Sequence, residues 1–278
     1  MIDAMIPLGP NDGDTVELTA RSVKRFVEGV RNVYVVSRED PRLPGVKFVA
    51  EESFPFDLET VRRALGEHDR AGWYLQQLIK LYFPLAVSGS LDQVLVVDAD
   101  TIFLRPCRFV EDGRTVLNFG DEYHAPYFAH MARLHPALRK MFAYSGVSHC
   151  MLLTRSWLLE LLGAVEERHA QAPFWKVYLE AVDLGERKHS GASEYEIYFN
   201  FCLLFHPLEV ILRRFHWRNA AGIEEIQPDQ DEYVSLHSYL RKEPLDRRKL
   251  AAIVFPPPGQ PEENKWGQTP LTLRGDAE

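Results

Sequence analysis

The sequence is poor in features that would set it apart from ordinary globular proteins. It has three cysteines in 278 residues and no C-x-x-C pair. Neither a disulfide framework nor a zinc knuckle is therefore indicated, and reduced thiols are the simplest account. The sequence also has no uncharged run of the roughly 18 residues that a membrane span needs, and no basic, apolar leader. We expect a cytoplasmic protein without a transmembrane segment, and peripheral membrane contact stays open.

Positive charge is in short supply as well. Lysine and arginine number 32 against 40 aspartates and glutamates, which gives a formal net charge of -8. A surface of this sign repels a phosphate backbone, so we expect no nucleic-acid partner, although a local basic pocket is compatible with it. Hydrophobic residues at 46% and charged residues at 26% are typical of a folded domain with a substantial core.

The first fifty residues alternate between strand and helix patterns. Residues 2–8 read as a strand that runs into a Gly-, Pro- and Asn-rich loop, and apolar residues recur at helical spacing over 15–30. Strands are expected over 32–37 and 47–50. This order predicts an α/β fold in which a mixed, mostly parallel sheet is the middle of three α/β/α layers. Such sheets bind ligands at the carboxyl ends of their strands.

Patterning predicts further elements along the rest of the chain. The expected helices are 57–66, 72–86, 156–169, 173–184 and the run after Ser193, and the expected strands are 94–97, 115–119, 150–154, 210–215 and 233–236. Residues 121–145 are rich in His, Tyr and Phe, which fits either an acceptor-binding lip or a partly buried loop. The proline-rich, polar residues 256–278 predict a flexible tail.

Two carboxylates stand at the end of the most apolar strand. Val94 to Val97 read as a strand buried on both faces, and Asp98 and Asp100 follow it directly. Charge at the edge of an apolar core is costly, so we expect a metal ion, a basic partner or backbone donors to neutralise it. Mg2+ and Mn2+ prefer oxygen ligands, and such an ion can bridge a departing diphosphate. A turn cap beside a solvated carboxylate is the structural alternative.

Two helices carry further polar residues with two explanations each. Trp73, Gln76, Gln77 and Lys80 fall on one side of the helix over 72–86, where they suit either a nucleotide or sugar, or plain solvent contact. Ser193 is a plausible N-cap, Glu196 would complete a capping box with it, and Glu194 lies in the first turn, where the helix dipole favours an anion. Both glutamates thus have a structural explanation and can also face a cleft.

The segments VLVVDAD, S-E-Y-E and L-H-S-Y, together with the β-α-β start, resemble the GT-A fold of nucleotide-sugar-dependent glycosyltransferases over about residues 2–242. The helix G-W-Y-x-Q-Q-x-x-K is similar to that of a bacterial glycosyltransferase-like family. The resemblance implies a single GT-A-like domain over 1–255, in which 1–105 bind the nucleotide-sugar and an elaborated C-terminal part, 106–255, binds the acceptor. It favours a UDP-sugar as donor and an acceptor with a free hydroxyl, such as a carbohydrate.

The resemblance also implies roles for single residues. The implied ligands of Mn2+ or Mg2+ are Asp98, Asp100 and His237, with Asp98 acting through Asp100 or a water. The implied donor-binding residues are Pro7, Leu8, Asp12, Trp73, Gln77, Lys80, Asp98 and Ala99. Glu194, with Glu196 in reserve, matches the acceptor-binding or catalytic carboxylate, which is the general base if the enzyme inverts. The S-E-Y-E segment departs from the better-known acidic motifs, which leaves the stereochemistry open.

Two other functions compete with this one. VLVVDADTI also fits the nucleophile motif of haloacid-dehalogenase-like phosphatases, in which Asp98 would attack phosphorus and Asp100 would act as acid and base. That family usually carries the motif near its N-terminus and an acidic pair later in the chain. Here a β-α-β unit precedes the motif, and Asp231-Glu232 is too loosely placed to serve. A non-catalytic nucleotide- or carbohydrate-binding protein is the third possibility.

Overall fold

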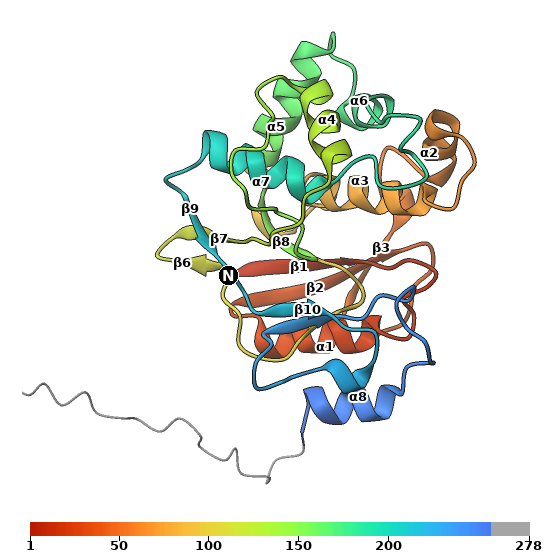
Figure 1. Cartoon of the computed structure of the whole chain (residues 1–278), viewed down its shortest axis with the longest axis vertical. Helices are drawn as coiled ribbons and strands as arrows, with labels where there is room; N and C mark the ends of the chain where they lie inside the picture. Colours follow the sequence, from red (N-terminus) through yellow and green to blue (C-terminus); the bar gives the residue numbers. More distant parts are fainter. Residues whose placement is uncertain (257–278) are drawn as a thin grey trace, which may run out of the picture.

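A five-stranded sheet forms the middle layer of the computed structural model, which describes residues 1–256 (Figure 1). Its strands are β1 (Ile2–Pro7), β2 (Val30–Ser37), β3 (Lys47–Ala50), β4 (Gln93–Val97) and β8 (Cys150–Thr154). They lie in the order β3-β2-β1-β4-β8, and all pairs are parallel except β4 with β8. The structure therefore confirms the predicted α/β class with a mixed, mostly parallel sheet.

Two small sheets extend this core. One has the order β10-β11-β5 and the other β6-β7-β9. Their strands are β5 (Thr101–Phe103), β6 (Val110–Glu111), β7 (Arg114–Asn118), β9 (Val210–Arg213), β10 (Trp217–Asn219) and β11 (Tyr233–Ser235). Because β11 pairs antiparallel with β5 and sets Ser235 opposite Thr101, the segment after β11 returns to the end of β4.

Helices cover both faces of the main sheet (Figure 1). One face carries α1 (Val16–Phe26), with α8 (Arg247–Val254) beyond it. The other face carries α2 (Leu58–Leu65), α3 (Ala71–Ala86), α4 (Ala125–Leu134), α5 (Arg155–Arg168), α6 (Phe174–Glu180) and α7 (Glu194–Phe205). Two 3-10 turns, Glu51–Ser53 and Ile223–Glu225, complete the described elements. Among residues 1–256, the helices are all too short or too polar to cross a membrane.

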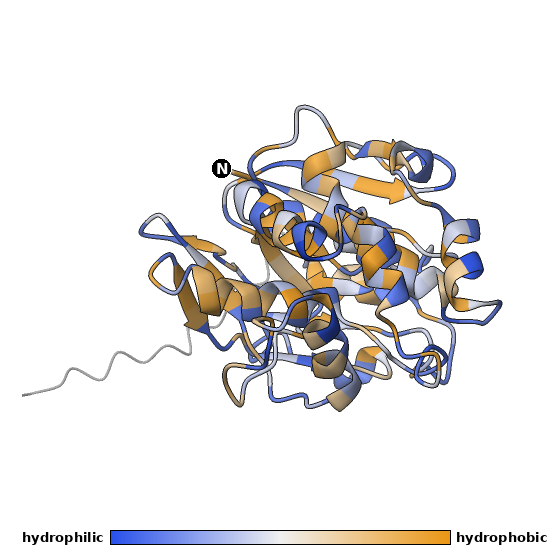
Figure 2. Ribbon diagram, turned by 90° about the horizontal axis from the view of Figure 1, so that it is seen from above, coloured by the Kyte–Doolittle hydropathy of each residue, from blue (hydrophilic) through white to orange (hydrophobic). Residues whose placement is uncertain are grey.

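The central strands β1, β4 and β8 are mostly apolar because both of their faces are buried. In β4, Val94 and Val96 pack into the cluster under α3, whereas Leu95 and Val97 pack into the cluster under α1. Successive side chains of a strand point to opposite faces, so an unbroken apolar run is what two helical layers require. Figure 2 shows the result, with mostly hydrophobic strands and mostly hydrophilic loops. All three cysteines are free and buried.

Several predicted boundaries shift, and two helices, α4 and α8, were not predicted. The first helix ends at Phe26, because Gly29 adopts a φ of 77° and starts β2 at Val30. The aromatic stretch 121–145 contains α4, so it is not simply a loop. Proline stands in the first turn of α4, where its missing N–H costs nothing. Asp246 caps the unpredicted α8. The predicted tail, apart from Pro256, lies outside the described residues.

The amino end of β1 shows how this fold satisfies a buried carboxylate. Asp3 is fully buried and accepts hydrogen bonds from Arg31 at 2.6 and 3.0 Å, from Asn32 at 3.1 Å and from the Leu91 amide at 2.8 Å. Burial alone would raise its pKa, but Arg31 and these donors hold the pKa below its usual value. Asp3 thus joins three segments of chain and lies far from the carboxyl ends of the strands.

The buried His130 predicts an acid-sensitive core. Burial lowers the pKa of His130 from 6.5 to about 4, and its Nε2 bonds the carbonyl of Tyr178 at 2.9 Å. Below pH 6.5, His130 is protonated in the unfolded chain but stays neutral in the folded chain. The free energy of unfolding therefore decreases as the pH falls from 6.5 to about 4. The loss should be about 3 kcal/mol. Urea unfolding at pH 7 and at about pH 4 measures this loss. If the free energy of unfolding of His130→Gln fell by the same amount between the two pH values, His130 would not be its cause.

Candidate functional site

The two carboxylates sit in a tight turn at the carboxyl end of β4. Asp98 follows the strand, and the amide of Thr101 bonds the Asp98 carbonyl at 3.0 Å. The carbonyl of Ala99 accepts a hydrogen bond of 2.8 Å from Thr19 on α1. Because β1 and β4 are parallel, the loop after Pro7 leaves the sheet at the same edge as Asp98. The turn is thus fixed by backbone contacts at the edge where such sheets bind ligands.

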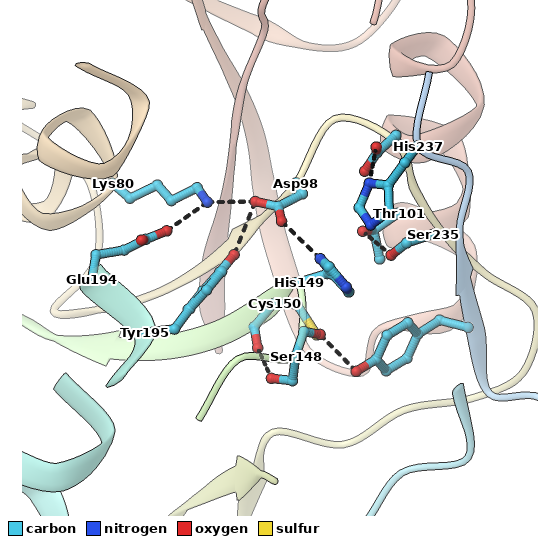
Figure 3. A network of polar contacts seen from close by, with 12 residues as sticks. Lys80, Asp98, Thr101, Ser148, His149, Cys150, Glu194, Tyr195, Ser235 and His237 are labelled. Carbon is cyan, nitrogen blue, oxygen red and sulfur yellow. Dashed lines mark hydrogen bonds and ion pairs between the residues drawn. The ribbon is translucent and has the colours of Figure 1, made fainter. Parts of the chain in front are cut away.

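The carboxylate of Asp98 already has three partners (Figure 3). Its Oδ1 lies 2.5 Å from Lys80 Nζ and accepts a hydrogen bond of 3.0 Å from the Tyr195 hydroxyl. Its Oδ2 lies 3.2 Å from His149 Nδ1. Burial would raise the pKa of Asp98, but Lys80 and His149 hold it well below its usual value. Asp98 is therefore a charged group that the protein itself neutralises.

Lys80 is shared between two carboxylates. Its ammonium lies 2.7 Å from Glu194 Oε1 as well as beside Asp98, and 4.4 Å from the centre of the Tyr195 ring. Only 7% of the Lys80 side chain and 6% of the Glu194 side chain is exposed. Burial would lower the pKa of Lys80, but the two carboxylates raise it. Burial raises the pKa of Glu194 against the opposing effect of Lys80.

Gln77 and Trp73, which lie on α3 with Lys80, are packed against other parts of the protein. Gln77 is 1% exposed, and its Oε1 accepts hydrogen bonds from the Glu194 amide at 3.1 Å and from the hydroxyl of Tyr178. It therefore holds the amino end of α7 against α3. Trp73 is half-buried against the core, with the guanidinium of Arg70 4.3 Å above its ring. The polar side of α3 is largely a helix-packing surface, and Lys80 is its one direct link to Asp98.

The capping box predicted at α7 is only half formed. Ser193 is the N-cap, as predicted, and its hydroxyl accepts from the Glu196 amide at 3.2 Å. The Glu196 carboxylate does not return to Ser193. It accepts instead from Ser145 and from Asn200, the latter at 2.8 Å, because both donors lie buried beside it. Glu196 is 1% exposed, and burial raises its pKa. Glu196 thus forms a polar cluster with Ser145 and Asn200 that is separate from Asp98 and its partners Lys80, Tyr195 and His149.

The second carboxylate, Asp100, is incompletely paired. The return of the chain after β11 sets His237 Nδ1 2.7 Å from Asp100 Oδ2. Asp100 Oδ1 is buried and has no hydrogen-bond partner in the described part of the chain. Burial, followed by the charges of Asp100 and Asp98, raises the pKa of nearby Asp12 to about 6. Burial would lower the pKa of His237, but its bond to Asp100 raises it. Within the described structure, His237 thus partners one oxygen of Asp100, and the other oxygen is unpartnered.

A divalent ion fits Asp100 better than it fits Asp98. Within residues 1–256 no three His, Cys, Asp or Glu side chains are grouped so that they could hold a metal. The predicted set Asp98, Asp100 and His237 is thus not assembled in this conformation, since Asp98 is engaged with Lys80 and His149. Mg2+ usually takes one or two carboxylates and completes its shell with phosphates and water. The unpartnered carboxylate oxygen of Asp100 is a donor of the kind that Mg2+ and Mn2+ prefer, and the imidazole of His237 lies beside it.

Sequence reasoning missed three residues of this site. His149 precedes β8, and because β8 runs antiparallel to β4 with Cys150 opposite Val97, it faces Asp98. Tyr195 follows Glu194 and bonds Asp98. Arg241 pairs with Asp14, which ties the loop after β1 to the segment carrying His237, and 8% of its side chain is exposed. A histidine at the start of a strand was the available signal for His149, but its use required the strand pairing.

The chain belongs to the family described as a family of unknown function, DUF6492, whose model matches residues 12–250. Comparison with curated proteins gave no match. Solved structures similar to this chain include mouse xyloside xylosyltransferase 1 in its apo form. The two share 11% sequence identity with a TM-score of 0.47, over 87% of this chain and 99% of the mouse chain.

Proposed function

We propose that the protein is a metal-dependent glycosyltransferase that moves a sugar from a nucleoside-diphosphate sugar, with UDP-sugars favoured, to an acceptor hydroxyl. The observation that carries the proposal is the buried, unpartnered Oδ1 of Asp100 at the carboxyl edge of a parallel sheet. A buried carboxylate oxygen needs a donor or a cation, and His237 meets only the other oxygen of Asp100. Mn2+ or Mg2+ bound by Asp100 and His237 would supply positive charge to the departing diphosphate.

The two halves of the domain divide the substrates. Residues 1–105 provide the sheet edge and the loop after β1, where Leu8 and Asp12 are partly exposed and Pro7 is buried; we assign this loop to the nucleotide. Residues 106–255 provide α7 and the aromatic segment around α4, which we assign to the acceptor. Tyr123 in that segment is 70% exposed, as suits a side chain that stacks on a carbohydrate.

The buried ion pairs set the roles of the remaining charged groups. Lys80 positions Asp98 and Glu194 relative to each other, since it contacts both carboxylates. We assign the role of the acceptor-facing carboxylate to Glu194, because Lys80 contacts both Glu194 and Asp98. Glu196 instead accepts hydrogen bonds from the buried Ser145 and Asn200. The raised pKa of Glu194 suits a group that takes a proton from a hydroxyl in the transition state.

A thermal-shift panel of nucleoside diphosphates tests the proposal. UDP or GDP should raise the melting temperature when Mn2+ is present and should have little effect in EDTA. At a hundredfold excess over the dissociation constant, we expect a rise of roughly 5–10 °C for a chain of this size. A protein that responds to no nucleotide, with or without metal, would contradict the proposal.

The phosphatase alternative makes a different prediction for the same residues. Asp98 as a nucleophile would need a free oxygen, but both of its oxygens carry contacts, to Lys80 and Tyr195 on one side and His149 on the other. Hydrolysis of p-nitrophenyl phosphate that Asp98→Asn abolishes, in a protein without nucleotide binding, would favour this alternative.

A further inference from the structure

His149 has a backbone conformation that residues with a side chain rarely adopt. Its φ is 61°, in the left-handed region where glycine is favoured. The conformation is imposed from outside, because the Asp98 amide bonds the His149 carbonyl at 2.9 Å and Cys150 is already locked opposite Val97. Strain that neighbouring structure enforces at the mouth of a site points to a functional side chain.

The imidazole of His149 is fixed in orientation (Figure 3). Its Nδ1 bonds Asp98 Oδ2, and its ring meets Trp217 at 4.9 Å and His237 at 4.8 Å, edge to face in both cases. The Asp98 carboxylate only accepts hydrogen bonds, so Nδ1 is the donor. In the neutral ring Nε2 then carries the lone pair.

The other ring nitrogen is left open. Nε2 of His149 has no hydrogen-bond partner among the described residues, and it is not one of the unpartnered polar atoms that are sealed from solvent. Packing alone does not account for a histidine here, since phenylalanine fills the same space and glycine adopts this φ without strain, and the bond to Asp98 engages Nδ1 only. The arrangement instead presents one acceptor atom from a ring that cannot turn.

We propose, on the basis of the function proposed above, that His149 is a donor-binding residue whose Nε2 accepts a hydrogen bond from a hydroxyl of the sugar being transferred. The His149 ring contacts Asp98 directly and lies against His237, which is bonded to Asp100. The sugar is joined to the diphosphate assigned to that group, so we infer that a sugar hydroxyl is the donor to Nε2. Asp98 is the positioning residue for His149.

The variant His149→Asn separates this role from structure. Asparagine readily adopts a left-handed backbone, and its amide N–H can replace the Nδ1 donor to Asp98, but it has no counterpart of Nε2. Isothermal titration would compare UDP with UDP-glucose and UDP-galactose, and GDP with GDP-mannose, in the presence of Mg2+. We expect about tenfold weaker binding of the accepted sugar nucleotide and a change of less than about twofold for its nucleoside diphosphate. His189→Asn, an exposed histidine, is the matched control.

A spectroscopic measurement covers the case in which His149→Asn does not fold. Imidazole 15N resonances of the unaltered protein, recorded with diamagnetic Mg2+, should show His149 protonated at Nδ1, and Nε2 should shift with the sugar nucleotide but not with the diphosphate alone. The inference about His149 alone would be overturned if His149→Asn weakened binding of the sugar nucleotide and of its nucleoside diphosphate equally. It would also be overturned if the Nε2 resonance did not change when the sugar nucleotide binds. Failure of the unaltered protein to bind any nucleotide would overturn the proposed function and this inference with it.

Discussion

Replacing Asp100 with alanine should abolish the metal-dependent part of nucleoside-diphosphate binding. Asp100 offers the one buried carboxylate oxygen of the site that has no partner in the described structure, and His237 is oriented by its other oxygen. Loss of residues that merely orient a metal ligand typically costs 10- to 100-fold in affinity, so loss of the ligand itself should cost more than about 100-fold. Titration of UDP or GDP into Asp100→Ala with Mn2+ measures this effect.

The matched control for Asp100→Ala lies at the other end of the same strand. Asp92 is an exposed carboxylate just before β4, and Asp92→Ala should leave nucleotide binding unchanged. The melting temperature of Asp100→Ala in EDTA shows whether the variant folds, because the substitution removes the unpartnered Oδ1 and also the bond from Asp100 to His237. Unchanged nucleotide affinity in a folded Asp100→Ala protein would remove Asp100 from the site.

Lys80→Met should destabilise the protein by about 3–5 kcal/mol. The ammonium of Lys80 neutralises both Asp98 and Glu194 in a buried setting, and removal of one partner of such a network leaves uncompensated charge. Methionine keeps the length and apolar stem of lysine, so lost packing contributes little. Urea unfolding near pH 7 measures the change in the free energy of unfolding.

Two further variants serve as the control and the rescue for Lys80→Met. Lys176→Met removes an exposed i,i+4 pair with Glu180, in which more than half of each side chain reaches solvent, and should cost less than about 0.5 kcal/mol. Adding Glu194→Gln to Lys80→Met should recover part of the loss, because one of the two stranded charges is gone. A loss under about 1 kcal/mol for Lys80→Met would show that Asp98 and Glu194 do not depend on its charge.

The main sheet could be predicted because its strands carry their own signal. β1, β4, β8 and the second half of β2 are buried on both faces, so each contains an apolar run, and the predicted bounds of β4 and β8 agree with the structure within one residue. Strands of two or three residues, such as β5 and β10, are too short to show a period. They exist because β11 pairs with both, which is a tertiary event.

The site could be predicted only where its functional residues lie close together in the sequence. Asp98 and Asp100 stand out because costly charges follow an apolar strand. The resemblance implied that Lys80 binds the donor at the same site, and its contacts in the structure are Asp98 and Glu194. His149 could not be assigned, because its place opposite Asp98 depends on the antiparallel pairing of β8.

Release of a nucleoside diphosphate from a nucleotide sugar is the measurement that tests glycosyl transfer most directly. In the absence of a known acceptor, slow transfer to water should release UDP or GDP from one of a small panel of nucleotide sugars when Mn2+ is present. The release should stop in EDTA and in Asp100→Ala, and it should persist in Asp92→Ala. No release from any nucleotide sugar, together with phosphate-ester hydrolysis that depends on Asp98, would contradict the account.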